Sequence, residues 1–183
     1  ADMIFTSSTY NDGPIFCRYP RGEGEGVDIP ETSKVIEIGK GKIVREGKDV
    51  AILALGTRVG AALSASDILS VKGYSITVAD ARFAKPIDTK LLENLWKNHS
   101  VLIIIEEGSA GGFSSHCLHY LSSNDMLSNT NKSIKCLTMP DNFQDHASQS
   151  AQLKEAGLDV DGLIKTIDKI YPLSNLNRNS INK

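Results

Sequence analysis

Four short strand-like segments, separated by stretches with helical periodicity, set the strongest limit on how this chain can fold. Residues 50–55 and 100–106 are almost continuously apolar, residues 76–81 form a short buried segment, and residues 134–139 form the last one. Continuous apolar strands are typical of a sheet that is covered on both faces. Strands that alternate with helices predict a parallel sheet with right-handed crossovers, so the fold class is α/β.

The remaining elements complete this prediction. Thr57, Asp88 and Asp159 are candidate N-caps. The 3.6-residue spacing of apolar positions predicts helices at residues 57–71, 88–98, 113–121, 148–156 and 160–170.

Residues 35–44 alternate around two glycines and are predicted to form a hairpin at the sheet edge. The sheet should therefore have about five strands, mostly parallel, with one antiparallel edge strand and helices on both faces. Residues 100–106 are the most apolar segment and are predicted to be the most central strand.

Composition excludes several classes of protein. The chain has 183 residues and a formal net charge of -2, which gives no electrostatic reason to expect nucleic acid or an anionic membrane as a partner. No apolar run approaches the roughly 20 residues that cross a bilayer. Three widely spaced cysteines form no CxxC pair, which favours reduced thiols and a cytoplasmic location.

The first residues do not resemble the start of a domain. Residues 2–10 resemble the end of a helix, residues 15–19 a short strand, and the glycine-rich run that follows a connector. We therefore divide the chain into residues 1–26, the tail end of a preceding domain with its linker, residues 27–172, the α/β domain, and residues 173–183, an Asn- and Ser-rich tail expected to be disordered. The chain is expected to be a fragment of a longer parent.

Arg82 is the leading candidate for a ligand contact. It stands where the strand at residues 76–81 should end, and ligands of open α/β sheets bind outside the carboxyl ends of the strands. Arginine holds phosphate or carboxylate in a bidentate fork. The alternative is a structural salt bridge to Asp80 or Glu106.

Other polar residues give weaker signals. Arg18, Tyr19 and Arg21 surround a proline, and the pattern also fits a solvated linker. Glu106 and Glu107 follow a strand and could serve in acid–base chemistry, pair with Arg82 or bind backbone amides.

The histidines indicate no specific chemistry. His116 and His119 share a predicted helix face, but no third ligand completes a metal set. His146 lies in the loop after the last strand, and no role is assigned to it.

Taken together, the motifs resemble the 1-deoxy-D-xylulose-5-phosphate synthase family of the transketolase superfamily. The resemblance runs in order from about residue 1 to about residue 170. It rests on the motifs at residues 11–14, 18–22, 38–42, 51–57, 79–88, 106–113 and 140–143.

The resemblance implies an activity for the parent protein. It would be a thiamine-diphosphate-dependent and Mg²⁺-dependent transferase that condenses pyruvate with glyceraldehyde 3-phosphate, releasing CO2, in isoprenoid precursor, thiamine and pyridoxal biosynthesis. Arg18 and Arg82 match the two family arginines that hold the acceptor phosphate, while Tyr19 and Arg21 match neighbouring positions. The parent would be a homodimer in a bacterial cytoplasm, with a plastid as the other option.

The cofactor and metal motifs of that family are absent from these residues. No catalytic, cofactor-binding or metal-binding residue is therefore assigned, and the chain alone is expected to be inactive, with no bound thiamine diphosphate or Mg²⁺. Two other interpretations stay open: a non-catalytic dimerisation or interaction module, and the C-terminal domain of a 2-oxoacid dehydrogenase beta subunit.

Overall fold

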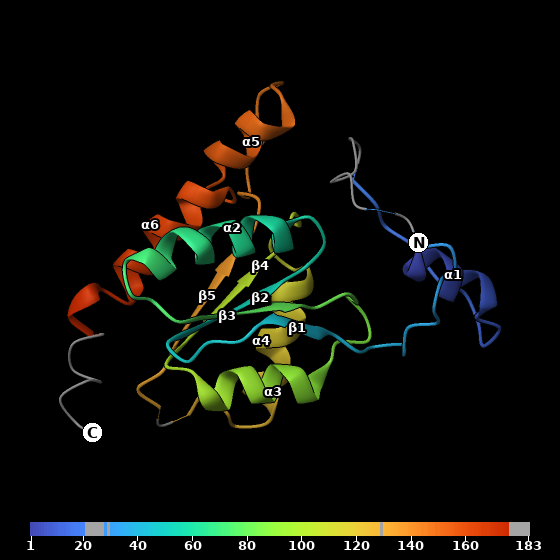
Figure 1. The fold of residues 1–183 in the computed structure, drawn as a ribbon, viewed down its shortest axis with the longest axis horizontal. Helices are drawn as coiled ribbons and strands as arrows, with labels where there is room; N and C mark the ends of the chain where they lie inside the picture. Colours follow the sequence, from blue (N-terminus) through green and yellow to red (C-terminus); the bar gives the residue numbers. More distant parts are fainter. Residues whose placement is uncertain (21–27, 29, 129, 176–183) are drawn as a thin grey trace.

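The computed structural model describes residues 1–20, 28, 30–128 and 130–175. Within these residues, five strands form one sheet in the order β1-β3-β2-β4-β5 (Figure 1). The strands are β1 (Lys42–Arg45), β2 (Val50–Ala54), β3 (Ile76–Asp80), β4 (Val101–Ile105) and β5 (Ser133–Leu137). Strand β1 pairs antiparallel with β3, and every other pair is parallel. The predicted fold class is confirmed.

Helices cover both faces of this sheet (Figure 1). The helices are α1 (Asp2–Thr9), α2 (Arg58–Val71), α3 (Thr89–Asn98), α4 (Phe113–Ser123), α5 (Gln149–Glu155) and α6 (Val160–Ile170). Helices α2 and α6 pack on one face, and α3 and α4 pack on the other. None of the described helices is both long and apolar enough to cross a bilayer.

The alternation of side chains along each strand builds two cores. On β4, Ile103 faces the core under α2 and α6, whereas Leu102 and Ile104 face the core under α3 and α4. All three side chains are fully buried. Each such side chain contributes about 1.5–3 kcal/mol relative to an exposed one, so the two cores hold the strand ends in fixed positions.

Two predicted helix caps are confirmed. The Asp88 carboxylate accepts from Leu91 N at 3.0 Å and also from Gly41 N at 3.0 Å, which ties α3 to the entrance of β1. The Asp159 carboxylate accepts from Gly162 N at 2.8 Å.

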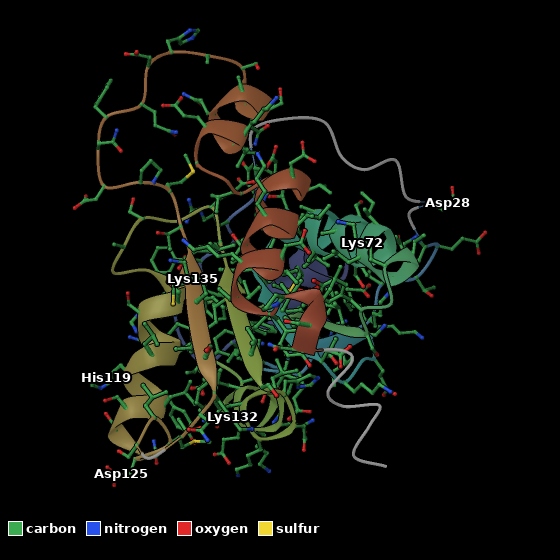
Figure 2. All side chains as sticks on the ribbon, turned by 90° about the vertical axis from the view of Figure 1, so that its left-hand side faces the viewer. Asp28, Lys72, His119, Asp125, Lys132 and Lys135 are labelled. Carbon is green, nitrogen blue, oxygen red and sulfur yellow. The ribbon has the colours of Figure 1, made fainter. Side chains whose placement is uncertain are left out.

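The other end of α3 is closed by a lysine. Lys132, labelled in Figure 2, donates from Nζ to the carbonyl oxygens of Trp96, Lys97 and His99 at 2.6–3.1 Å. These carbonyls belong to the end of α3 and the residue after it, where no intrahelical donor is left.

The strand positions correct one prediction. The middle strand of the five is β2, not the segment at residues 100–106. Both β2 and β4 are completely buried, so continuous apolar sequence shows that a strand is covered on both faces but not which strand is central. Strand β3, which precedes Arg82, lies between the edge strand β1 and the middle strand β2.

The predicted hairpin at residues 35–44 is wrong. Only its second arm forms a strand, β1, which pairs with β3. In the first arm, Ile36 N donates to Thr6 Oγ1 at 2.8 Å, and just before this arm Lys34 N donates to Asp2 Oδ1 at 3.0 Å. This arm therefore binds α1 in place of a second strand.

The amino-terminal segment lies to one side of the α/β layers (Figure 1). A helix is present at α1, as predicted, but residues 15–19 form no strand. The described residues offer no neighbouring strand there, and a strand needs one to pair its backbone groups. Residues 21–27 of the predicted connector and 176–183 of the predicted tail lie outside the described residues.

Candidate functional site

The carboxyl ends of β2, β3, β4 and β5 meet at one edge of the sheet, because these strands run parallel. Polar residues follow them at this edge: Thr57 after β2, Arg82 after β3, and Glu106 and Glu107 after β4. The edge is therefore the place where the predicted site residues can converge.

Arg82 has an unusual backbone conformation. Its φ angle is 57°, in the left-handed region that a residue with a side chain rarely adopts. The following residue closes a tight turn around it, since Phe83 N donates to Ala81 O at 2.5 Å. Residues held in sparsely populated conformations cluster at ligand clamps and active sites, so this turn supports Arg82 as a candidate ligand contact.

Asp80 is the nearest carboxylate to Arg82 among the described residues. Its Oδ1 accepts from Arg82 N at 2.9 Å, whereas Oδ2 lies 4.0 Å from Arg82 Nε, at the limit of an ion pair. Burial raises the pKa of Asp80, although the Arg82 amide and the charges of Arg82 and Lys42 lower it in part. The predicted alternative of a salt bridge to Asp80 thus exists only as a long contact.

Glu106 serves the helix that follows it. Its carboxylate accepts from Phe113 N at 3.0 Å and from Ser114 N at 2.7 Å, the first amides of α4, and the residue is 3% exposed. A Cβ on Gly112 would lie 2.7 Å from Glu106 Oε2, so a larger residue there would displace this carboxylate. Of the roles weighed from sequence, backbone amide binding is the one that the structure supports.

Glu107 belongs to a cluster that the sequence did not reveal. Arg58 Nη2 lies 2.8 Å from Glu107 Oε1, and Arg58 Nη1 donates to Leu158 O at 2.8 Å. Thr57 stands at the N-cap position of α2, as predicted, but its hydroxyl donates to the same Glu107 carboxylate and makes no capping hydrogen bond. The sequence carried one signal of this cluster. Arg58 is a charged residue at the first position of an otherwise largely apolar helix, shortly after the end of β2.

Arg18 approaches this edge from the amino-terminal segment. Its Nη2 lies 3.4 Å from the backbone oxygen of Glu107, while Tyr19 is 82% exposed. Strands β3 and β4 flank β2, so Arg82 and the Glu107 carbonyl follow strand ends about 10 Å apart. Arg21 lies outside the described residues.

The histidines do not form a metal site. His146 is exposed in the loop after β5, and His116 and His119 are exposed on α4, where His119 points outward (Figure 2). In the described ranges, no three His, Cys, Asp or Glu side chains are grouped to hold a metal ion. We assign no chemical step to a metal or cofactor among the described residues.

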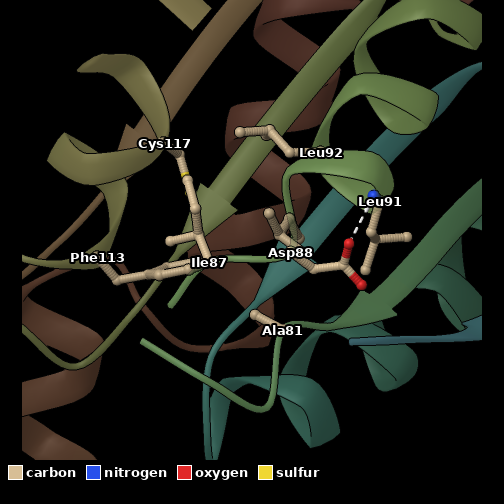
Figure 3. Close-up of a pocket in the computed structure, with 8 residues that line it drawn as sticks. Ala81, Ile87, Asp88, Leu91, Leu92, Phe113 and Cys117 are labelled. Carbon is tan, nitrogen blue, oxygen red and sulfur yellow. Dashed lines mark hydrogen bonds between the residues drawn. The ribbon is translucent and has the colours of Figure 1, made fainter. Parts of the chain in front are cut away.

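A small cavity lies beneath the candidate edge, between α3 and α4 (Figure 3). Its volume is about 10 Å³, which is the size of one water at most. Its lining is mainly apolar: Leu53, Ala81, Ile87, Asp88, Leu91, Leu92, Phe113 and Cys117. The cavity is a packing defect and not a substrate pocket.

Comparison with known proteins places this domain in a family. Residues 39–163 match the family model for the transketolase C-terminal domain. The chain belongs to this family. The match begins before β1 and includes all five strands, so the strand-end residues after β2, β3 and β4 are residues of a transketolase C-terminal domain.

A solved structure supports the same assignment. The chain is similar to a protein described as "Split gene transketolase, inactive beta4 tetramer", with 26% sequence identity and a TM-score of 0.65. The alignment covers 82% of this chain but 46% of the other, so this chain spans less than half the length of that protein.

Proposed function

We propose that this transketolase C-terminal domain is part of a thiamine-diphosphate-dependent synthase that condenses pyruvate with glyceraldehyde 3-phosphate. The products would be 1-deoxy-D-xylulose 5-phosphate and CO2. In this proposal the domain holds the phosphate of the aldehyde acceptor, and the cofactor and its metal bind to parts of the full-length protein other than the described residues. The parent is expected to act as a homodimer.

The observation that carries this proposal is that the Arg82 guanidinium has no close carboxylate partner among the described residues. Arg45 and Arg58 are neutralised by carboxylates at 2.6 and 2.8 Å. Among the described residues, Arg82 has only the 4.0 Å approach to Asp80, and its side chain is 29% exposed. It therefore keeps donors for a ligand, at the edge where α/β sheets bind ligands.

Arg18 supports the same proposal. It lies on the described segment before the α/β domain, and its contact with the Glu107 carbonyl, at 3.4 Å, is long for a hydrogen bond. A phosphate dianion between Arg18 and Arg82 would offer both guanidiniums short, charge-assisted bonds. Tyr19 and Arg21 are proposed neighbours of this phosphate.

The test is a product assay on the full-length parent with thiamine diphosphate, Mg²⁺, pyruvate and glyceraldehyde 3-phosphate. The proposal predicts equal amounts of CO2 and of a five-carbon deoxysugar phosphate. Acyl transfer to a lipoyl group without the sugar phosphate would favour the 2-oxoacid dehydrogenase interpretation. Absence of any thiamine-dependent turnover would favour the non-catalytic interaction module.

A further inference from the structure

We infer that Asp80 is the positioning residue for Arg82, holding its backbone in the turn from which the guanidinium meets the acceptor phosphate. This inference rests on the proposed function of Arg82 and adds a second residue to that site. Asp80 would not touch the substrate.

The first argument is conformational. At φ 57° the Cβ of Arg82 crowds its own backbone, so an unrestrained chain would leave this region. Asp80 Oδ1 accepts from Arg82 N at 2.9 Å, which is an interaction of the type that short acidic side chains make with the backbone two residues on. This hydrogen bond fixes the peptide that enters Arg82.

The second argument is that Asp80 is itself held firmly. It pairs with Lys42 of β1 and with Ala54 of β2, so strands lie on both sides of it. The next residue extends the ladder, since Ala81 N donates to Ala54 O at 2.8 Å. A carboxylate fixed in this way can transmit the rigidity of the sheet to Arg82.

The third argument concerns charge. A tight bidentate pair would occupy the guanidinium, but Asp80 Oδ2 stays 4.0 Å from Arg82 Nε. The carboxylate thus binds the backbone of Arg82 and leaves its side chain available. Burial also raises the pKa of Asp80, so its surroundings disfavour the charged form of the carboxylate. Arg82 and Lys42 are the charged groups that face it, and they lower its pKa in part.

The experiment compares variants of the full-length enzyme with glyceraldehyde 3-phosphate and with unphosphorylated glyceraldehyde as acceptors. Asp80→Ala should raise the KM for the phosphorylated acceptor about tenfold, because a misplaced binding group loses most of its contribution. The KM for glyceraldehyde should not change. Asp80→Asn should stay within about twofold of the parent enzyme, because its amide oxygen can still accept from the Arg82 amide.

Asp49→Ala is the matched control. Asp49 also accepts a backbone hydrogen bond, from Ser75 N at 2.8 Å, but at the amino ends of β2 and β3. Its loss should lower stability without changing the KM for the phosphorylated acceptor.

Hydrogen exchange of the Arg82 amide in the 183-residue chain gives a readout that does not depend on turnover. Exchange should be slow in the parent chain and in Asp80→Asn, and faster in Asp80→Ala. Exchange that is equally slow in Asp80→Ala would overturn the inference even if that variant loses activity.

The outcomes separate the inference from the proposed function. If Arg82→Ala raises the KM for the phosphorylated acceptor and Asp80→Ala does not, the positioning role is wrong and the phosphate role stands. If Arg82→Ala leaves that KM unchanged, the proposed function fails and the inference fails with it.

Discussion

Arg58 Nη2 lies 2.8 Å from Glu107 Oε1, so an ion pair joins the first residue of α2 to the second residue after β4. Their side chains are 10% and 26% exposed. Arg58 also donates to Leu158 O, which brings the segment before α6 into the same contact. Arg58 therefore links α2, the segment after β4 and the segment before α6, next to the edge where Arg18 and Arg82 lie.

Removing Arg58 should cost considerable stability. Arg58→Ala leaves the Glu107 carboxylate partly buried without its partner, and the expected loss is about 3 kcal/mol in the free energy of unfolding. Urea denaturation would measure it. Arg45→Ala is the control, since the Arg45–Asp67 pair is short at 2.6 Å but 33% and 67% exposed. That variant should lose less than about 1 kcal/mol, and equal losses would contradict the prediction.

Glu106 should matter for the fold rather than for acid–base chemistry. Glu106→Ala leaves the buried amides of Phe113 and Ser114 without an acceptor, so unfolding should become easier by about 2–3 kcal/mol. Glu106→Gln keeps one acceptor oxygen and should lose roughly half as much. Thermal and urea unfolding would test the expected order of stability, in which the parent chain is the most stable, Glu106→Gln is intermediate and Glu106→Ala is the least stable. A fully stable Glu106→Ala variant would show that these amides find other partners.

The pH dependence of stability should carry the signature of Asp80. Because burial raises its pKa, the folded chain binds the Asp80 proton more tightly than the unfolded chain does. The pKa of Asp80 is higher in the folded chain than in the unfolded chain. As pH falls from above the folded-state pKa to the unfolded-state pKa, the contribution of Asp80 to the free energy of unfolding must therefore increase. From about pH 7 to about pH 4, the parent chain should gain stability relative to Asp80→Asn. The opposite slope would mean that Arg82 and Lys42 outweigh burial.

The cysteines should differ in reactivity. Burial raises the pKa of Cys117 to about 12, and this side chain is 0% exposed, whereas Cys17 is exposed. Burial also raises the pKa of the half-buried Cys136. Alkylation at about pH 8 followed by peptide mass spectrometry should therefore modify Cys17 first and Cys117 only after denaturation. Rapid native labelling of Cys117 would contradict the packing between α4 and the sheet.

The sheet and its covering helices could be predicted because continuous apolar strands alternate with helices whose caps, such as Asp88 and Asp159, are local in sequence. The partner of an alternating segment could not be predicted in the same way. Residues 35–41 have the pattern of a strand, but Ile36 N bonds to Thr6 Oγ1 on α1. The sequence around Ile36 does not indicate that it pairs with Thr6, and the sequence around Thr6 does not indicate Ile36, because the two residues lie 30 positions apart.

The candidate site could be predicted in part for the same reason. Arg82 is a candidate because it directly follows a strand, and the amide-binding role of Glu106 was among those weighed. The Arg58–Glu107 pair was missed because its partners lie on separate elements that only the parallel sheet brings together. The left-handed backbone of Arg82 was also missed, because the sequence there carries no glycine to signal it.

The measurement that tests the central proposal most directly is the effect of Arg82→Ala in the full-length enzyme on the KM values of both substrates. If Arg82 holds the acceptor phosphate, use of glyceraldehyde 3-phosphate should weaken by about 2–5 kcal/mol, while the KM for pyruvate and the melting temperature hardly change. Equal losses for both substrates, or a large fall in melting temperature, would contradict the phosphate role and favour a structural role for Arg82.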